Sequence, residues 1–273
     1  MIKITLNYNE VTIVIKDFIK TYVEYSGCKG VVIGLSGGVD SAITAILSRQ
    51  VLGKKKTICL FMPDGSTPDS DINHLKNLVN KFNLICKTKD ISEIVKNMEN
   101  KCFIKPNKMT LANMKARIRM ILLFEYANMS ESIICGTTNK SELLLGYFTK
   151  YGDGGADIMP IGDLYKTQIY DLAKFLKIPK EIIKKVPTAG LIKGQTDEKE
   201  LGLTYEILDK VLMGLEIKQD IHEIIENTRL KKLEIEKIKN MRIKSEHKRH
   251  SPLIPKIGLR TSGYDWRSPI EIK

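Results

Sequence analysis

The residues of this chain best suited to chemistry are 36–41, Ser-Gly-Gly-Val-Asp-Ser, which combine two adjacent glycines, two hydroxyls and one carboxylate. Adjacent glycines let a phosphate approach the backbone closely because no Cβ stands in the way. The hydroxyls of Ser36 and Ser41 add hydrogen-bond donors. The carboxylate of Asp40 would repel a phosphate, but it becomes useful if it holds a divalent cation that in turn binds the phosphates. The segment therefore predicts a site for a polyphosphate and a cation.

Local elements on both sides can position this segment. Residues 31–35 form an apolar run typical of a buried parallel strand, and the residues from 42 onward are typical of a helix. A strand, a glycine turn and a helix aim backbone N–H groups and a helix N-terminus at one point. A Gly-Gly turn can also be no more than a turn, but here the whole string stands between a strand and a helix. It resembles the pyrophosphate loop of the N-type ATP pyrophosphatases.

Other phosphate-binding classes are disfavoured. No GxxxxGK[ST] sequence occurs in the chain, which argues against a P-loop kinase or GTPase. The loop is not a GxGxxG sequence either, which argues against a dinucleotide-binding redox fold.

Strands and helices alternate through the first half of the chain. Beyond residues 31–35, strands are expected at 57–62, 84–88 and 132–135, and amphipathic helices at 11–25 and 107–128. This order predicts an α/β fold with a Rossmann-like doubly wound parallel sheet of the adenine nucleotide alpha hydrolase type. Ligands of such sheets bind beyond the carboxyl ends of the strands at the switch point. We therefore expect residues 36–41 and 136–142 to surround one pocket.

The pattern changes after residue 145. Residues 148–163 form a Gly/Asp-rich loop, and mostly helical stretches with irregular connections follow. Long irregular stretches in a compact domain are usually functional or mobile. We expect residues 1–273 to form one domain with a helical C-terminal elaboration, and no additional domain for hydrolysing glutamine.

Composition limits the location and partners of the chain. It has 273 residues and a net charge of +12. No run of about 18 apolar residues predicts a membrane span, and the N-terminus lacks a signal-peptide pattern. Five scattered cysteines without a CxxC suit a reducing cytosol. We expect a cytoplasmic protein without a membrane or nucleic-acid partner, because a polyphosphate substrate also needs the basic residues.

Glu142 is a candidate second metal ligand. It lies in the helix turn expected after the strand at 132–135. Either it completes a metal site with Asp40, or it is only a helix-start glutamate favoured by the dipole. Mg²⁺ typically takes one or two carboxylates together with phosphates, so the nearby phosphate loop favours the metal-ligand interpretation.

Further charged residues lie on the long helix and in the Gly-rich loop. Arg117 and Arg119 are two apart on a helix and do not face the same way, so one could reach a pocket while the other is solvated. The charged residues of the Gly-rich loop and of the helix start after it have two interpretations. Lysines there would stabilise the charge that develops on a leaving pyrophosphate, or the charges would only keep a surface loop hydrated. The residues open to both interpretations are Lys150, Asp153, Asp157 and Lys166.

Beyond the phosphate loop, motifs along nearly the whole chain resemble those of the ammonia-dependent NAD⁺ synthetases. GDGGAD and GQTDE, together with the HKR and DWR sequences near the C-terminus, are specific to that family. The motifs that carry the resemblance are GLSGGVDS (34–41), NMKARIRM (113–120), CGTTNKSE (135–142), the stretch 147–169, VPTAGLIKGQTDEKELG (186–202) and 247–269.

The resemblance implies a two-step reaction. The nicotinate carboxylate of deamido-NAD⁺ attacks the α-phosphate of ATP, and ammonia then attacks the adenylate, giving NAD⁺, AMP and pyrophosphate. Asp40 and Glu142 would hold Mg²⁺, and Asp40, Lys166 and Asp153 would be catalytic. The residues implied to bind ATP are Gly34, Leu35, Ser36, Gly37, Gly38, Val39, Asp40, Ser41, Thr137, Lys166 and Thr188.

The resemblance also implies a deamido-NAD⁺ site and a homodimer. Ammonia would come from solution or from a separate protein. Two alternatives remain open: a tRNA-modifying enzyme of the same superfamily, which the absence of paired cysteines disfavours, and a non-catalytic adenine-nucleotide-binding module. The residues implied to contact deamido-NAD⁺ are Arg117, Lys150, Asp157, His247 and Lys248.

Overall fold

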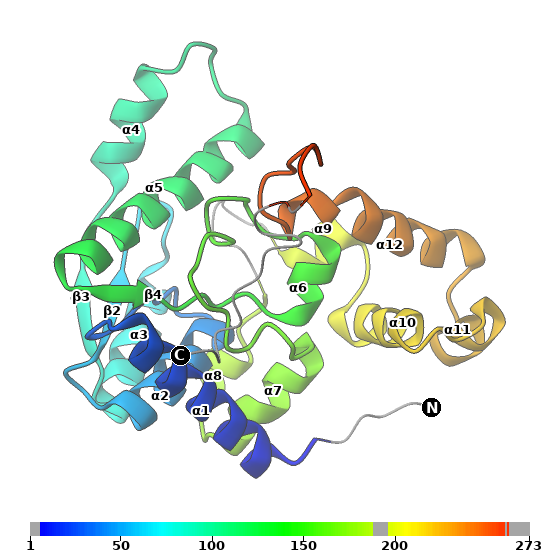
Figure 1. Ribbon diagram of the computed structural model, residues 1–273, viewed down its shortest axis with the longest axis horizontal. Helices are drawn as coiled ribbons and strands as arrows, with labels where there is room; N and C mark the ends of the chain where they lie inside the picture. Colours follow the sequence, from blue (N-terminus) through cyan, green and yellow to red (C-terminus); the bar gives the residue numbers. More distant parts are fainter. Residues whose placement is uncertain (1–5, 188–195, 260, 262–273) are drawn as a thin grey trace.

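Four parallel strands form the centre of the computed structural model, which describes residues 6–187, 196–259 and 261 (Figure 1). Their order is β3-β2-β1-β4, so the direction of winding reverses between β1 and β4. Val31 pairs with Thr57 on one side and Ile133 on the other. This confirms the predicted doubly wound α/β sheet. The strands are β1 (Gly30–Gly34), β2 (Thr57–Phe61), β3 (Ile85–Thr88) and β4 (Ser132–Ile134).

Helices cover both faces of this sheet because side chains alternate along each strand. Val31 and Ile33 belong to the apolar cluster that includes α1 and α2. Val32 belongs to the cluster on the other face, which includes α4 and α5. The helices of this half are α1 (Tyr8–Ser26), α2 (Val39–Leu52), α3 (Asp69–Phe82), α4 (Ser92–Asn100) and α5 (Lys108–Met129).

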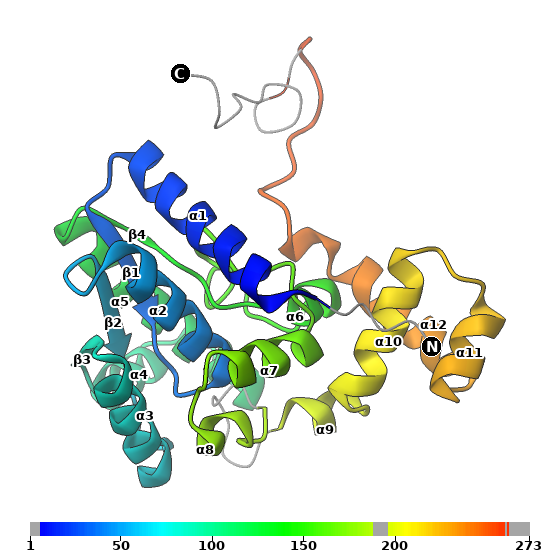
Figure 2. The ribbon, with the colours of Figure 1, turned by 90° about the horizontal axis from the view of Figure 1, so that it is seen from below.

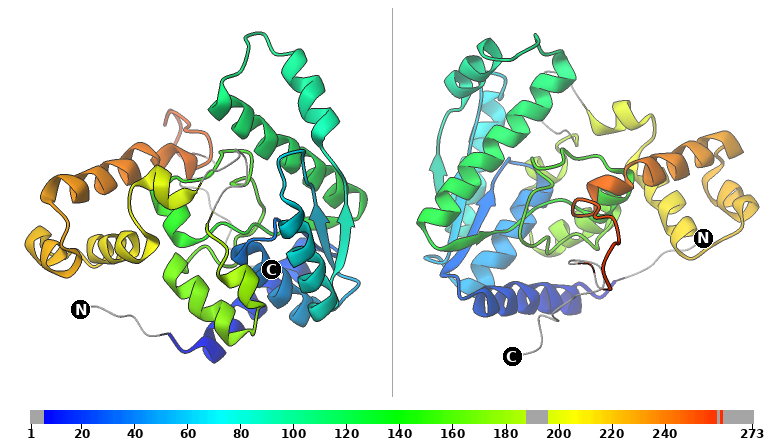
Figure 3. Two further views of the ribbon diagram at one scale, coloured as in Figure 1. Left: turned by 180° about the vertical axis from the view of Figure 1, so that it is seen from behind. Right: turned by 45° about the horizontal axis from the view of Figure 1, so that its top comes forward.

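Ile169, Leu172 and Ile182 still belong to the apolar cluster that includes α1 and α2, whereas the last helices of the chain extend the molecule beyond the β4 side of the sheet. Figures 1–3 show α10–α12 at the end opposite to α3 and α4. Leu208, Leu212, Ile224 and Ile235 belong to a separate apolar cluster there. The elements are α6 (Lys140–Leu145), α7 (Lys166–Phe175), α8 (Lys180–Ile183), α9 (Asp197–Leu201), α10 (Tyr205–Glu216), α11 (Ile221–Thr228), α12 (Lys232–Lys244) and the 3₁₀ turn η1 (Glu246–Lys248).

No helix in the described part of the chain is long and apolar enough to cross a membrane.

Candidate active site

The loop between β1 and α2 is organised by its two serines. The backbone N–H of Ser36 donates to Ser41 Oγ at 3.2 Å, and that of Gly38 donates to Ser36 Oγ at 3.2 Å. Gly37 has a φ of +76°, in the left-handed region that favours glycine. Gly38 is the N-cap of α2, and because it carries no side chain, no side-chain hydrogen bond caps the N-terminus of this helix. The predicted strand, glycine turn and helix are therefore present.

The turn after β4 lies against this loop. Asn139 and Glu142 form a capping box at the start of α6, in which each side chain accepts a hydrogen bond from the other residue's backbone N–H. The Asn139 amide also donates to Asp40 Oδ1 at 2.9 Å. The two turns were expected to adjoin at the carboxyl ends of the strands, and the pairing of β1 with β4 confirms this expectation.

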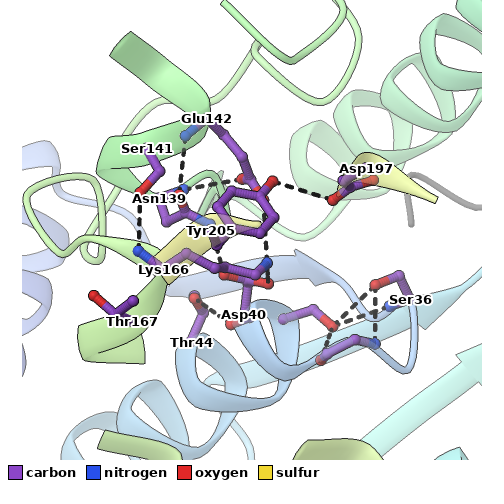
Figure 4. A network of polar contacts seen from close by, with 12 residues as sticks. Ser36, Asp40, Thr44, Asn139, Ser141, Glu142, Lys166, Thr167, Asp197 and Tyr205 are labelled. Atoms are coloured by element: carbon purple, nitrogen blue, oxygen red, sulfur yellow. Dashed lines mark hydrogen bonds and ion pairs between the residues drawn. The ribbon is translucent and has the colours of Figure 1, made fainter. Parts of the chain in front are cut away.

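Lys166, the first residue of α7, places its ammonium group between two carboxylates (Figure 4). Its Nζ lies 2.6 Å from Asp40 Oδ2 and 3.3 Å from Glu142 Oε1. The side chain is only 4% exposed. Burial alone would lower the pKa of Lys166, but the two carboxylates outweigh it and raise the pKa above its usual value. The lysine is therefore held charged.

Two acidic side chains face a single ammonium group at this point. Burial raises the pKa of Glu142 to about 8; Lys166 acts against this rise and the nearby Asp40 charge adds to it. Asp40 and Glu142 thus share one ammonium group, and their carboxylate oxygens are of the type that Mg²⁺ prefers. Within the described ranges no cluster of three or more His, Cys, Asp or Glu side chains could hold a metal alone. A cation here would need oxygens from a substrate, as Mg²⁺ does when it binds phosphates.

A cavity of about 790 Å³ opens over these groups. It reaches from the phosphate loop to the ends of β2 and β4 and to α7. Asp153, from the Gly-rich loop, lies on its wall and accepts a hydrogen bond from the Thr149 backbone at 2.9 Å. The predicted residues that line it are Gly34, Leu35, Ser36, Gly38, Val39, Asp40, Ser41, Thr137, Glu142, Asp153 and Lys166.

Arg119 is the arginine of α5 that lines the cavity. Its Nε donates to the Met62 carbonyl at 3.0 Å, and one terminal nitrogen lies 3.4 Å from Asp64 Oδ2. Lys115 Nζ lies 3.0 Å from the same oxygen. Asp64 also accepts from the Ser66 backbone at 2.9 Å, so α5 holds the loop that follows β2 through this carboxylate. Sequence alone did not single out Asp64 or Lys115.

Arg117 points elsewhere, toward the other residues implied to bind deamido-NAD⁺. Its Nε donates to the Lys150 carbonyl at 3.3 Å, and Lys150 Nζ donates to the His247 carbonyl at 2.5 Å. Lys248 Nζ donates to the Gly146 and Phe148 carbonyls at 2.7 and 2.9 Å. Four predicted residues thus gather beside the Gly-rich loop.

Asp157, the fifth residue implied to contact deamido-NAD⁺, contacts the sheet instead. The carboxylate of Asp157 accepts from the Ile134 backbone at 2.7 Å, which fixes the Gly-rich loop to β4. Thr188 lies outside the described residues.

Several residues near Lys166 were not predicted. Asn139 could have been found, because Asn139 and Glu142 match the N-cap and N3 positions of a capping box. Tyr205 and Asp209 lie in an apolar helix whose sequence gives no sign of their contacts. The Tyr205 hydroxyl donates to Asp197 Oδ2 at 3.2 Å, and its ring centroid lies 5.3 Å from Lys166 Nζ.

Comparisons with known proteins agree with this site. The family model described as NAD synthase matches residues 11–252. The NH₃-dependent NAD⁺ synthetase of Sulfurisphaera tokodaii is 41% identical over 274 residues, covering 98% of this chain and 96% of that protein.

Solved structures show the same relationship. NMN synthetase from Francisella tularensis has a TM-score of 0.83 and 32% identity, over 93% of this chain and 100% of that one. NH₃-dependent NAD synthetase from Campylobacter jejuni has a TM-score of 0.79 and 35% identity, over 92% and 100%. Neither alternative left open by the sequence, tRNA modification or nucleotide binding alone, is favoured. The chain belongs to the NAD synthase family.

Proposed function

We propose that this chain is a ligase that amidates the nicotinate carboxyl group of deamido-NAD⁺ with ammonia, using ATP and Mg²⁺. The observation that carries the proposal is the placement of the Lys166 ammonium group between Asp40 and Glu142, at the mouth of a Ser-Gly-Gly loop. Family membership supports the same reaction.

The reaction needs this arrangement because a carboxylate is a poor electrophile. In the first step the nicotinate carboxylate attacks the α-phosphate of ATP, and pyrophosphate leaves. In the second step ammonia attacks the acyl carbon, and AMP leaves. Two anionic substrates must meet, so the phosphate loop and Lys166 offset their repulsion and the charge that develops on pyrophosphate. Mg²⁺ held by Asp40 and Glu142 would supply further positive charge at the phosphates.

Asp153 has the properties of a proton acceptor for the second step. It lies on the cavity wall, and burial raises the pKa of its carboxyl group, although the hydrogen bond from Thr149 partly opposes the rise. A raised pKa makes a carboxylate a better base near neutral pH. We therefore assign Asp153 the removal of a proton from ammonium or from the attacking amine.

The first experiment measures pyrophosphate release and NAD⁺ formation by the purified chain. We expect release only when ATP, Mg²⁺ and deamido-NAD⁺ are all present, and NAD⁺ only when ammonium is added. Omission of Mg²⁺ serves as the control for the metal. ATP binding without pyrophosphate release under any of these conditions would overturn the proposal in favour of a binding module.

One comparison suggests nicotinate mononucleotide as a second candidate substrate. The structural neighbour with a TM-score of 0.83 is named NMN synthetase. The same amidation applied to nicotinate mononucleotide would yield NMN, which is the nicotinamide half of NAD⁺. Parallel assays with deamido-NAD⁺ and nicotinate mononucleotide decide between them through their kcat/KM values. We expect deamido-NAD⁺ to be preferred, because a curated relative over nearly the full length is named for NAD⁺.

We also propose a homodimer and free ammonia as the nitrogen donor, either from solution or from a separate protein. Exposed apolar side chains on two helices support the dimer. On α1 these include Ile13 and Val14, which are 61% and 66% exposed, and on α5 Ile121 is 64% exposed. Such side chains on helices otherwise packed against the sheet are typical of a surface that another chain covers.

A further inference from the structure

The N-terminal turn of α7 is held by side chains from two other helices. The backbone N–H of Lys166 donates to Ser141 Oγ at 2.9 Å, and that of Thr167 donates to Asp209 Oδ2 at 2.8 Å. The first N–H groups of a helix have no partner within the helix, so they need such acceptors. Ser141 belongs to α6 and Asp209 to α10.

Asp209 also links these two helices to each other. Its second oxygen, Oδ1, accepts a hydrogen bond from Ser141 Oγ at 2.5 Å. One carboxylate therefore binds α7 directly and α6 through a hydroxyl that itself accepts from Lys166. Asp209 is 1% exposed and Ser141 is fully buried. Burying a carboxylate is unfavourable unless it is hydrogen-bonded, and here both oxygens have partners.

The two helices joined in this way carry the groups at the centre of the site. Glu142 follows Ser141 directly on α6, and Lys166 is the first residue of α7. A shift of either helix would change the distances from Lys166 Nζ to the carboxylates of Asp40 and Glu142. Lys166 is thus fixed at its backbone by Ser141 and at its ammonium group by these two carboxylates.

Helix α10 also contacts Lys166 directly. Tyr205 lies one turn before Asp209, so the two side chains share a face of α10. The Tyr205 ring lies beside the Lys166 side chain, with its centroid 5.3 Å from Nζ (Figure 4). Helix α10 therefore contacts the start of α7 at two places, the backbone of Thr167 and the side chain of Lys166.

We infer that Asp209 is a positioning residue for the adenylation step, because it holds α6 and α7 so that Lys166 and Glu142 meet Asp40 at the phosphates. This inference rests on the proposed function of the site. It gives the helical C-terminal part a role in pyrophosphate release, although none of its helices belongs to the phosphate loop.

The test uses Asp209→Asn, which keeps the size of the side chain but replaces one of the two acceptor oxygens, which face Ser141 and Thr167, by an NH₂ donor. We expect kcat for pyrophosphate release to fall about 10- to 100-fold while KM for ATP changes less than about threefold, since a small displacement of a catalytic group lowers the rate more than substrate binding. Ser141→Ala should lower kcat in the same way, and the double variant should lose less than the product of the single losses.

Ile224→Val is the matched control. Ile224 is 1% exposed and belongs to the same C-terminal apolar cluster, but it lies on α11. It should lower the thermal midpoint with little change in kcat. If the kcat of Asp209→Asn equals that of wild type, or if it falls only in proportion to the loss of folded protein, the inference is wrong. If Asp209→Asn does not fold, Ser141→Ala decides by the same criterion.

A second measurement does not depend on the reaction. Acetylation of individual lysines is followed by mass spectrometry in the chain without substrates. Lys166 should react slowly in the wild type, because its side chain is 4% exposed, and about tenfold faster in Asp209→Asn, where local opening is easier. Unchanged Lys166 labelling in Asp209→Asn would overturn the inference. If Lys166 is acetylated faster in Asp209→Asn as expected but the wild-type chain makes no NAD⁺, the proposed function is rejected and the positioning role of Asp209 stands.

Discussion

Lys166 combines deep burial with two anionic neighbours, which is an unusual setting for a lysine that must act on a polyphosphate. Lysine is rarely buried unless it is paired. If its ammonium group moved away, Asp40 and Glu142 would lose the positive charge that they share. The lysine is therefore already oriented before the nucleotide arrives, and little reorganisation is needed when charge develops on the leaving pyrophosphate.

We predict that Lys166→Ala lowers kcat by about 10²- to 10³-fold and changes the KM for ATP much less, because the lost interaction is strongest in the transition state. Steady-state kinetics of pyrophosphate release provide the measurement. Lys174→Ala, on the same helix but with a side chain that is 65% exposed, is the control and should behave as wild type. Unchanged kcat in Lys166→Ala would remove this residue from the transition state.

The loop that follows β2 depends on one carboxylate. Burial opposes ionisation of Asp64, but hydrogen bonds from Ser66 and the charge of Lys115 prevail and hold its pKa below the usual value. A lowered pKa stabilises the fold at pH values above the pKa of the unfolded chain, about 4. That contribution is lost as the pH falls through the lower pKa of the folded state.

We predict that Asp64→Asn lowers the free energy of unfolding by about 2 kcal/mol at pH 7. The difference from wild type should shrink as the pH falls below about 4 and through the lower pKa of the folded state, where the wild-type carboxyl group also becomes protonated. Urea unfolding across this range measures both effects. Asp17→Asn, an exposed substitution on α1, should change the stability little at any of these pH values. A difference that grows as the pH falls would contradict the prediction.

The sequence predicts a helix or strand well where the residues that determine it lie close together in the chain. The apolar run at 31–35, the glycines after it and the helix that follows all lie within one short stretch, and β1 and α2 appear there. Helix α11 was not predicted, and α9 lies in a stretch expected to be irregular. Helix α11 has eight residues and α9 has five, so their periodicity was too brief to recognise.

The candidate site divides in the same way. The phosphate loop, Glu142 and Lys166 stand in recognisable motifs. Asp209 does not, because its bond to Ser141 joins residues 68 positions apart and depends on how α10 packs. The residues alone likewise left the choice between Arg117 and Arg119 open, and the family resemblance implied a substrate contact for Arg117 only. The choice is decided by tertiary contacts: Arg119 reaches the end of β2, and Arg117 reaches Lys150.

For the molecule as a whole, we predict a dimer in solution. The substitutions Val14→Glu and Ile121→Glu, on α1 and α5, should each shift the sedimentation equilibrium toward the monomer, because a charge placed in a buried apolar interface is unfavourable. Leu233→Glu is the control, since Leu233 is 80% exposed on α12, far along the chain from both helices. A wild-type chain that sediments as a monomer would reject the dimer.

The spread of these contacts along the chain affects how the protein is made. Asp40, Glu142, Lys166 and Asp209 come from α2, α6, α7 and α10, in that order. A growing chain on the ribosome has the phosphate loop early, but it lacks the partners of Asp40 until α7 has emerged and lacks the support for α7 until α10 has emerged. Nucleotide therefore cannot guide the early folding of the sheet through the complete site. The strands must find their order unaided, and ligand can stabilise the protein only near the end of synthesis.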